Sequence, residues 1–371
     1  MICTQMAGQI RDFEWDVLLE KLKSPRCECA LVLGEGAYFD AASSGLLLKD
    51  QYNRFLDQQL PGLFKRQSDD DLLSMAEHDR TTFCTKVRGF YAAQAPDGFL
   101  KQIAQIPFPL IINTVPHGQL AKAFPPGVAQ LRYYDRSAQQ KKIENPSTAT
   151  PLIYNLLGTI DDDNTLVLTY NNLFDYFEAI FGEYGLPAEL RQILRGIRYF
   201  VFLGVPFDRW YFHLFLRILN IQEYKTAHRH APVDARFGED VMAFCNELFE
   251  IKFVTGRTRV PEFAAELHRR CEAEGILRTE DGSRLSTLEA IERALPENEL
   301  EKALELFGRL FKEQNSDELA DDLAILSARY RKYKSGVRSG ILDHRDATTE
   351  HARLVSGLQE LLKSARKLPA L

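Results

Sequence analysis

The stretch CALVLGEGAYF (29–39) decides the fold class, because an unbroken apolar run ends in it at a Gly-x-Gly turn. A strand that is apolar at every position is covered on both faces, as in a parallel sheet between helices. Four more runs of this kind are FPLIINTV (108–115), PLIYNLLGTI (151–160), RYFVFLG (198–204) and EIKFVT (250–255). TLVLTY (165–170) predicts a further strand after a turn of Asp and Asn residues.

The segments between these runs have the hydrophobic spacing of helices. Helices are predicted over 11–24, 43–59, 69–92, 117–124, 170–181, 187–196, 208–219, 238–248 and 258–273. Strands that alternate with helices indicate a doubly wound, mostly parallel, Rossmann-type α/β domain, which we place at residues 1–275. Beyond it, leucine and aromatic stripes repeat at helical spacing, so residues 276–371 are predicted to form a small all-α helical bundle.

The overall charge argues against several classes of function. Lys and Arg number 46 and Asp and Glu 52, which gives a net charge of −6 over 371 residues. Mild acidity is atypical of proteins that coat nucleic acid or anionic membranes. No apolar run reaches the ~18 residues of a spanning helix, and we see no secretory leader. Six scattered cysteines are typical of reduced thiols, so we expect a cytoplasmic protein with no direct nucleic-acid or membrane partner.

The first candidate site is the loop of Gly34, Glu35 and Gly36. A strand that runs into Gly-x-Gly is how nucleotide-binding folds bring the backbone close to phosphate. The third glycine of the dinucleotide fingerprint is replaced here by Phe39. The sequence therefore leaves two readings, a nucleotide-binding loop and an ordinary strand-to-helix turn.

Two further loops follow predicted strands, where α/β sheets place their ligands. Asn113 could hydrogen-bond a ribose and His117 could act as a base, with turn chemistry and a helix cap as the alternatives. Gly204 ends another strand, and Asp208 is predicted to cap the helix that follows. The acidic turn 161–163 lacks the ligand spacing of a calcium loop, so we expect no metal site.

The order of these segments resembles the sirtuin-like domain of prokaryotic anti-phage defence proteins, over about residues 10–275. PLIYNLLGTIDDDNTLVLTYNNLFDYF (151–177) is similar to the family's His-Gly strand, acidic turn and following helix. YFVFLGVPFDRWYFHLFLRIL (199–219) is similar to its strand, Gly-x-x-x-Asp loop and helix. LVLGEGAYF (31–39) stands where a Gly-Ala-Gly loop belongs, and IINTVPHGQLAKAF (111–124) where a Thr-Thr-Asn-x-Asp segment belongs.

This resemblance implies a cleft that lacks the residues with which active members of the family work. Active members use the Asn and His of these motifs to cleave nicotinamide from NAD. The His falls here on Leu157, which cannot accept a proton, and the Asn falls on Val115, or on Asn113 if the pairing shifts. The family's Asp falls on His117, and Glu35 replaces Ala where the pyrophosphate would lie, which disfavours an anionic ligand. The implied, degenerate cofactor-binding residues are Gly34, Glu35, Gly36, Asn113, Gly158, Gly204 and Asp208, with NAD or ADP-ribose as the possible ligand.

The C-terminal stretch 296–365 is similar to the effector-associated domains of bacterial conflict systems. The resemblance implies a helical adaptor that binds a protein partner carrying a like domain, and we also expect a homo-oligomer. A plain helical dimerisation bundle is the alternative. Tyr330 and Tyr333 stand among basic residues, and this segment would suit an acidic face on a cognate adaptor. Both tyrosines could instead belong to the core.

Three hypotheses for the function follow. The first is a degenerate, non-catalytic sirtuin-like scaffold or sensor of a bacterial anti-phage or conflict system, recruited through its C-terminal helices. The second is an active NAD-cleaving effector that uses Asn113 or His117. The third is a nucleic-acid-associated factor, which the acidic charge disfavours. Leu157 separates the first two, and we favour the first.

Overall fold

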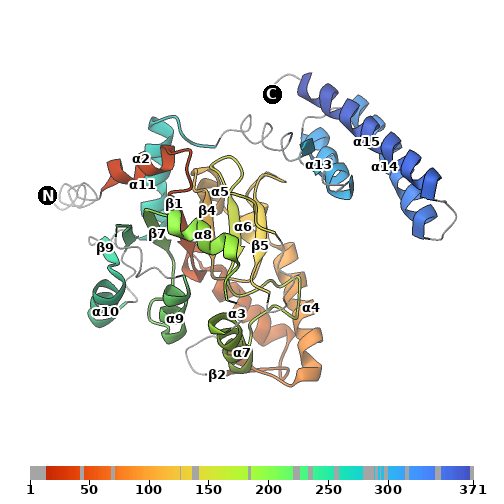
Figure 1. The fold of residues 1–371 in the computed structure, drawn as a ribbon. Coiled ribbons are helices and arrows are strands. Elements are labelled where there is room, and N and C mark those ends of the chain that lie inside the picture. The colour runs from red at the N-terminus through yellow and green to blue at the C-terminus, as the bar shows by residue number, and fades with distance from the viewer. Residues whose placement is uncertain are drawn as a thin grey trace. The chain divides into compact units, whose positions relative to one another are not determined.

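The computed structural model describes residues 14–41, 46–67, 72–125, 127–135, 142–182, 185–219, 226–232, 237–254, 259–278, 288, 291–292, 294–295, 300–313, 317–338 and 344–367. The chain divides into two compact units (Figure 1). The first comprises residues 1–124 and 129–278, and the second comprises residues 125–128 and 279–371.

A seven-stranded sheet forms the centre of the first unit, and every strand pair in it is parallel. The strand order is β5-β6-β4-β1-β7-β8-β9. The strands are β1 (Cys29–Leu33), β4 (Leu110–Asn113), β5 (Gln130–Tyr133), β6 (Leu152–Asn155), β7 (Tyr199–Leu203), β8 (His228–Pro232) and β9 (Lys252–Val254). The parallel α/β fold predicted from the apolar runs is confirmed.

The central strands are buried on both faces, as their continuous apolar sequences predict. All residues of β1, β4, β6 and β7 are buried. One face packs against α7 (Tyr170–Phe181), α8 (Ala188–Gly196), α9 (Trp210–Ile218) and α10 (Glu239–Phe249). Ala30, Val32, Phe200 and Phe202 alternate along their strands toward this core.

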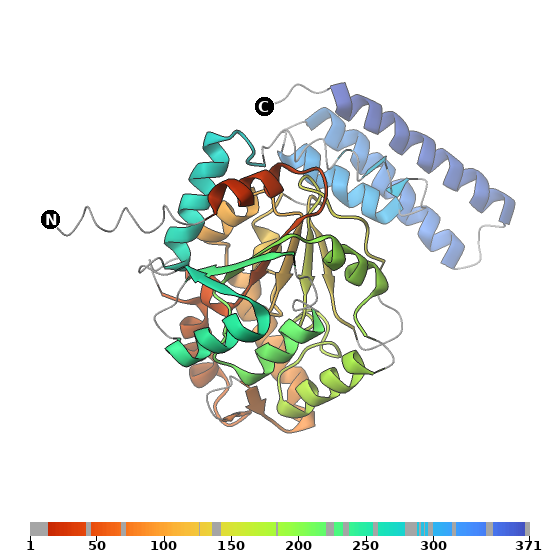
Figure 2. The same cartoon turned by 60° about the vertical axis from the view of Figure 1, so that its left-hand side comes forward.

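Helices α2 (Trp15–Lys23), α5 (Gly98–Gln105) and α11 (Val260–Ala273) pack with one another away from that core. Figure 2 shows α2 and α11 on one side of the sheet and α8 on the other. The indole of Trp15 stacks on Phe263, with 5.1 Å between the ring centroids. Asp97 caps α5, since its carboxylate accepts a hydrogen bond from the Leu100 amide at 2.9 Å.

A long insertion separates β1 from its neighbour β4 and forms a small core of its own. Its elements are η2 (Glu35–Ala37), α3 (Leu48–Gln59), β2 (Lys65–Gln67), β3 (Leu72–Ser74) and α4 (Glu77–Ala93). The sequence predicted only helices here, and the hairpin of β2 and β3 is a correction. This core includes Leu56, Phe83 and Val87, together with Leu166 from the loop after β6. The insertion therefore packs at the carboxyl ends of the strands, where ligands bind in such folds.

The prediction of a strand over 165–170 is wrong. The carbonyl groups of Asp163, just before this segment, and of Leu166, within it, accept hydrogen bonds from the Arg80 guanidinium, each at 2.7 Å. Thr169 makes only an isolated bridge with Leu73 and then caps α7 through its hydroxyl. A side chain distant in sequence thus satisfies part of the backbone of this segment.

Strands β5 and β8 were not predicted because their sequences, QLRY and HRHAP, are not apolar runs. In β8 the Arg229 side chain is buried beside Phe200 of β7, and its guanidinium donates to the Glu250 carboxylate at 3.0 Å. Burying a charged strand residue is tolerable here because an opposite charge partners it.

The second unit is mostly helical over the described residues from 288 onward, as predicted. It contains α13 (Leu300–Glu313), α14 (Asp317–Arg338) and α15 (His344–Lys367). Their leucine and phenylalanine stripes meet in one hydrophobic core. Tyr330 and Tyr333 pack against that core as partly buried side chains, which favours the core reading of the two tyrosines.

None of the helices within the described ranges is long and apolar enough to cross a membrane. The five described cysteines carry free thiols.

Candidate functional site

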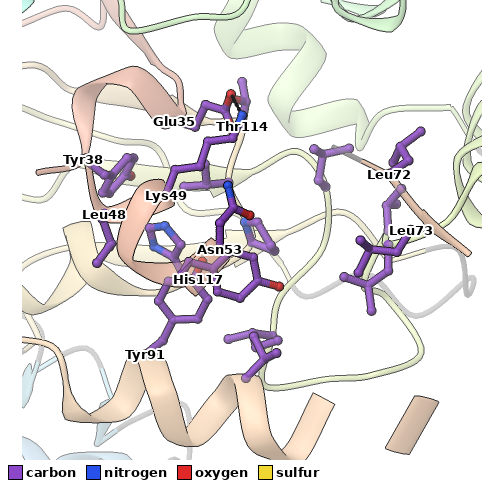
Figure 3. Close-up of a pocket in the computed structure, with 18 of the residues that line it drawn as sticks. Glu35, Tyr38, Leu48, Lys49, Asn53, Leu72, Leu73, Tyr91, Thr114 and His117 are labelled. Atoms are coloured by element: carbon purple, nitrogen blue, oxygen red, sulfur yellow. Dashed lines mark hydrogen bonds and ion pairs between the residues drawn. The ribbon is translucent and has the colours of Figure 1, made fainter. Parts of the chain in front are cut away.

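A cavity of about 170 Å³ opens at the carboxyl ends of β1, β4 and β6. The loops after these strands form one wall, and α3 and α4 of the insertion form the other. Figure 3 shows His117 beside Tyr91, with Lys49 reaching toward Glu35. Of the residues predicted from sequence, Glu35, Val115, His117 and Leu157 line this cavity.

Asn113 ends β4 with its side chain buried, and it holds three segments together. Its amide oxygen accepts from the Tyr38 hydroxyl at 2.8 Å. Its amide nitrogen donates to the Val115 carbonyl and to the side-chain oxygen of Asn155, both at 2.9 Å. Both N–H groups are therefore used within the protein, and Asn113 fixes the loop after β4 against the loop after β1.

His117 lies on the cavity wall between two tyrosine rings. The ring centroid of Tyr91 is 4.4 Å from the imidazole, and that of Tyr38 is 4.6 Å away with the rings perpendicular. The side chain is 4% exposed, and burial lowers the pKa of His117 to about 3. Its Nδ1 has no hydrogen-bond partner among the described residues. At neutral pH the imidazole is thus uncharged and a weak base.

The burial of the neutral His117 imidazole predicts that the free energy of unfolding falls at acid pH. The pKa of His117 is about 3 when folded and near 6.5 when unfolded, so below pH 6.5 the unfolded chain binds the extra proton. The contribution of the neutral His117 side chain to stability is present above pH 6.5 and is lost as the pH falls toward 3. Between pH 7 and pH 5, His117→Phe should lose about 2 kcal/mol less unfolding free energy than the unmodified protein.

Urea titrations at both pH values measure this difference. His78→Phe is the matched control, because the His78 side chain is 84% exposed and should leave the pH dependence unchanged. An equal loss for the unmodified protein and His117→Phe would contradict the assignment of a buried neutral imidazole.

Glu35 and Lys49 form an ion pair at the rim of the cavity. The Lys49 ammonium lies 2.8 Å from the Glu35 carboxylate, and both side chains are more than two-thirds buried. Both residues also line a smaller hollow of about 90 Å³ with Gly204, Asp208 and Arg209. The carboxylate that the sequence placed at the pyrophosphate position is therefore neutralised by a lysine of the insertion.

The glycines of the loops after β1 and β7 contact each other. The amide of Gly34 donates to the Leu203 carbonyl and that of Gly36 to the Gly204 carbonyl, each at 2.9 Å. A Cβ on Gly34 would lie 2.4 Å from the Gly204 oxygen, and Gly204 has φ of +64°. These glycines are needed because the loops after β1 and β7 pack backbone against backbone.

Asp208 does not cap the helix after β7, which corrects the prediction. The residue at the N-cap of α9 is Arg209, and no side chain accepts from the first turn. Asp208 is exposed and borders the smaller hollow instead. Gly158 takes φ of +78°, and a Cβ there would lie 2.0 Å from the Thr165 carbonyl oxygen. Its neighbour Leu157 packs partly buried against the main core and lines the cavity.

Sequence reasoning missed Tyr38, Lys49, Tyr52 and Tyr91, which all line the cavity. Tyr38 is the only one next to a motif, two residues after Gly36, and its hydroxyl bond to Asn113 could not be foreseen. The others lie on α3 and α4, where a tyrosine or lysine on a helix carries no signal of its own. The pairing of the insertion with the strand ends brings them to the site.

The described residues include no group of three or more His, Cys, Asp and Glu side chains that could hold a metal ion. In the acidic turn, the Asp163 carboxylate is bound by the Arg88 guanidinium at 2.6 Å, and Asp162 pairs with Thr159 in an isolated bridge.

Comparison with protein families gives a match in the C-terminal part of the chain. Residues 286–366 match the family model of effector-associated domain 11, which covers less than a quarter of the chain. No match to a sirtuin-like domain supports the resemblance of the first unit, which stays a prediction. None of the curated proteins matches the chain. Residues 286–366 are thus similar to an effector-associated domain, as their sequence predicted.

Proposed function

We propose that this chain is a non-catalytic, sirtuin-like scaffold or sensor of a bacterial anti-phage or conflict system. Its α/β unit forms the body, and its helical unit recruits a protein partner that carries a like adaptor domain. We place it in the cytoplasm and propose that it works as a homo-oligomer. The match of residues 286–366 to an effector-associated domain supports the adaptor role.

The non-catalytic role rests on the hydrogen bonds of Asn113 and on the lowered pKa of His117. Both amide N–H groups of Asn113 donate within the protein, so donating to a ribose would break its bond to Val115 or to Asn155 of β6. A base with a pKa of about 3 removes a hydroxyl proton poorly at neutral pH. At the end of β6, the cavity wall is Leu157, which has no titratable group.

The same cavity supports a sensor role. It has aromatic walls and a few polar groups, which is typical of small-molecule sites. Because Lys49 neutralises Glu35, the rim does not repel a phosphate as strongly as the sequence alone indicates. NAD or ADP-ribose is therefore the ligand to test first, bound without being cleaved.

The second candidate function is NAD cleavage by a divergent site. The observation in its favour is the Nδ1 atom of His117, which is buried at the cavity wall without a partner among the described residues. A bound substrate could supply that partner, and an uncharged imidazole is the form that accepts a proton.

A turnover assay separates the two functions. The full-length protein at micromolar concentration should leave NAD intact over hours, because His117 has a pKa of about 3 and Leu157 has no titratable group. Leu157→His alone should not create activity, since it leaves Glu35 and Val115 in place. Chromatography of released nicotinamide measures the result, and calorimetry with NAD and ADP-ribose measures binding.

Nicotinamide release that is lost in both Asn113→Ala and His117→Ala would overturn the non-catalytic role. His78→Ala is the matched control, because His78 is an exposed histidine away from the cavity.

A further inference from the structure

Helix α14 has two unlike sides. Its inner side carries Leu323, Leu326 and Tyr330, which pack into the core of the second unit. On the outer side, the Ile325 side chain is 65% exposed. Ile325 lies in the middle of this 22-residue helix, and its exposed side chain is available for contact with another protein.

Charges of opposite sign flank Ile325 on this outer side. Asp321 and Asp322 precede it, Arg329 and Lys332 follow it, and all four residues are exposed. At about 100° per residue, these four positions lie within about 60° of Ile325 around the helix axis. We call these five residues the α14 face. Along the axis, its order is acidic, apolar and basic.

Such a face is complementary to itself when two copies meet antiparallel. With a two-fold axis through Ile325 and a rise of about 1.5 Å per residue, Asp322 of one copy comes level with Arg329 of the other to within about 2 Å. Asp321 then comes level with Arg329 of that copy and lies about 4.5 Å from Lys332 along the axis. The two isoleucines meet at the axis, and each charge pair occurs twice because the interface is isologous.

The alternative orientation is disfavoured. In a parallel pair, the aspartates of both copies would face each other at one end and the cations at the other. Like charges in contact cost free energy, so the sequence of charges selects the antiparallel pair. Within its own unit, the Arg329 guanidinium lies 3.4 Å from Glu350 of α15, with the side chain 52% exposed, so it stays within reach of a second copy.

We propose that the α14 face is a self-association surface, and that its occupant is the α14 face of a second copy of this chain, antiparallel about Ile325. The inference rests on the proposed adaptor role of the helical unit and is independent of NAD chemistry. It names the residues through which the chain forms a homo-oligomer.

A charge-exchange experiment on the full chain tests this pairing by sedimentation velocity. One variant, Asp321→Lys with Asp322→Lys, has an all-basic face. The other, Arg329→Asp with Lys332→Asp, has an all-acidic face. Each alone should dimerise at least about 100-fold more weakly than the unmodified chain, because every cross pair becomes repulsive. Their equimolar mixture should regain dimers, because every cross pair becomes attractive.

Three measurements complete the design. Glu360→Lys, an exposed position on α15, is the control and should leave the dimer unchanged. Ile325→Ser should weaken it while circular dichroism keeps its helical signal, because the side chain is solvent-exposed. The unmodified dimer should weaken with added salt, since its charge pairs lie at a solvent-accessible surface.

A chain that stays monomeric at tens of micromolar would overturn the inference. So would variants that dimerise as well as the unmodified chain, or a mixture that does not recover. These outcomes leave the non-catalytic role intact. NAD cleavage by a dimer that obeys the charge exchange would overturn the proposed function and keep the inference.

Discussion

Replacing Arg278 by methionine is expected to lower the free energy of unfolding of the first unit by about 4 kcal/mol. The Arg278 guanidinium donates to the carbonyl groups of Ala104, Ile106, Phe108 and Thr148. Methionine keeps the stem but leaves the carbonyls of Ala104, Phe108 and Thr148 without this donor, at about 1–3 kcal/mol each where water cannot replace it. The Ile106 carbonyl still accepts from the Phe108 amide at 2.8 Å.

The charge of Arg278 does not add to this loss, because burying it costs free energy that the substitution removes. Burial lowers the pKa of Arg278 to about 9, so the guanidinium stays protonated at pH 7. It also lies over the Phe124 ring, with 5.4 Å between its carbon and the ring centroid. Its role is to supply several donors in a fixed plane to the turn between α5 and β4, a role that only arginine fills.

Urea denaturation of the full chain, followed by tryptophan fluorescence, measures the effect. Lys101→Met is the matched control, because it removes an exposed cation from α5 and should leave the transition in place. Arg278→Lys should lose most of the stability as well, since one ammonium cannot reach four carbonyls. A shift no larger than that of the Lys101 variant would show that water satisfies these groups.

Gly204→Ala should destabilise the first unit by about 3 kcal/mol. The residue takes φ of +64°, which costs about 1 kcal/mol for alanine. Its added Cβ would lie 2.2 Å from the Ala37 nitrogen and 2.4 Å from the Gly36 carbonyl carbon. Both neighbours are backbone of the β1 loop and cannot rotate away, so overpacking adds about 2 kcal/mol.

Gly204→Ala should also separate the loops after β1 and β7. The Gly36 amide joins these loops by donating to the Gly204 carbonyl at 2.9 Å. Hydrogen exchange of that amide measures the separation. Gly98→Ala is the control, because nothing lies within 4 Å of its added Cβ at the start of α5. The control should be neutral or stabilise by about 0.5 kcal/mol. Equal stability of the two variants would contradict the close approach of the loops.

Local pattern predicted the main strands because they are covered on both faces. Nearly every position is apolar in β1, β4, β6 and β7. A run of that kind is typical of a strand that helices cover on both faces of a parallel sheet. Prediction failed where a distant side chain supplied the hydrogen bonds. Arg80 satisfies the Leu166 carbonyl of the predicted strand 165–170, and Glu250 allows Arg229 to lie in β8.

The candidate site shows the same division. Its strand-end residues, Asn113, His117 and Leu157, were found because parallel strands present their carboxyl ends at one edge of the sheet. The sequence did not predict the hydrogen bonds of Asn113 or the lowered pKa of His117. The Asn113 amide is held by Tyr38 and Asn155, and burial between Tyr38 and Tyr91 lowers the pKa of His117.

The sequence alone determined the α/β class of the first unit, the helical nature of the second and its similarity to an effector-associated domain. These properties depend on periodicity and on short-range order along the chain, which the printed residues contain. Only the tertiary structure decided that Lys49 neutralises Glu35, that Asn113 is a clamp, and that the glycine loops contact each other. Such pairings join residues tens to hundreds of positions apart, and a hydrogen bond or a buried charge has energy only once folding has brought both partners together and excluded water.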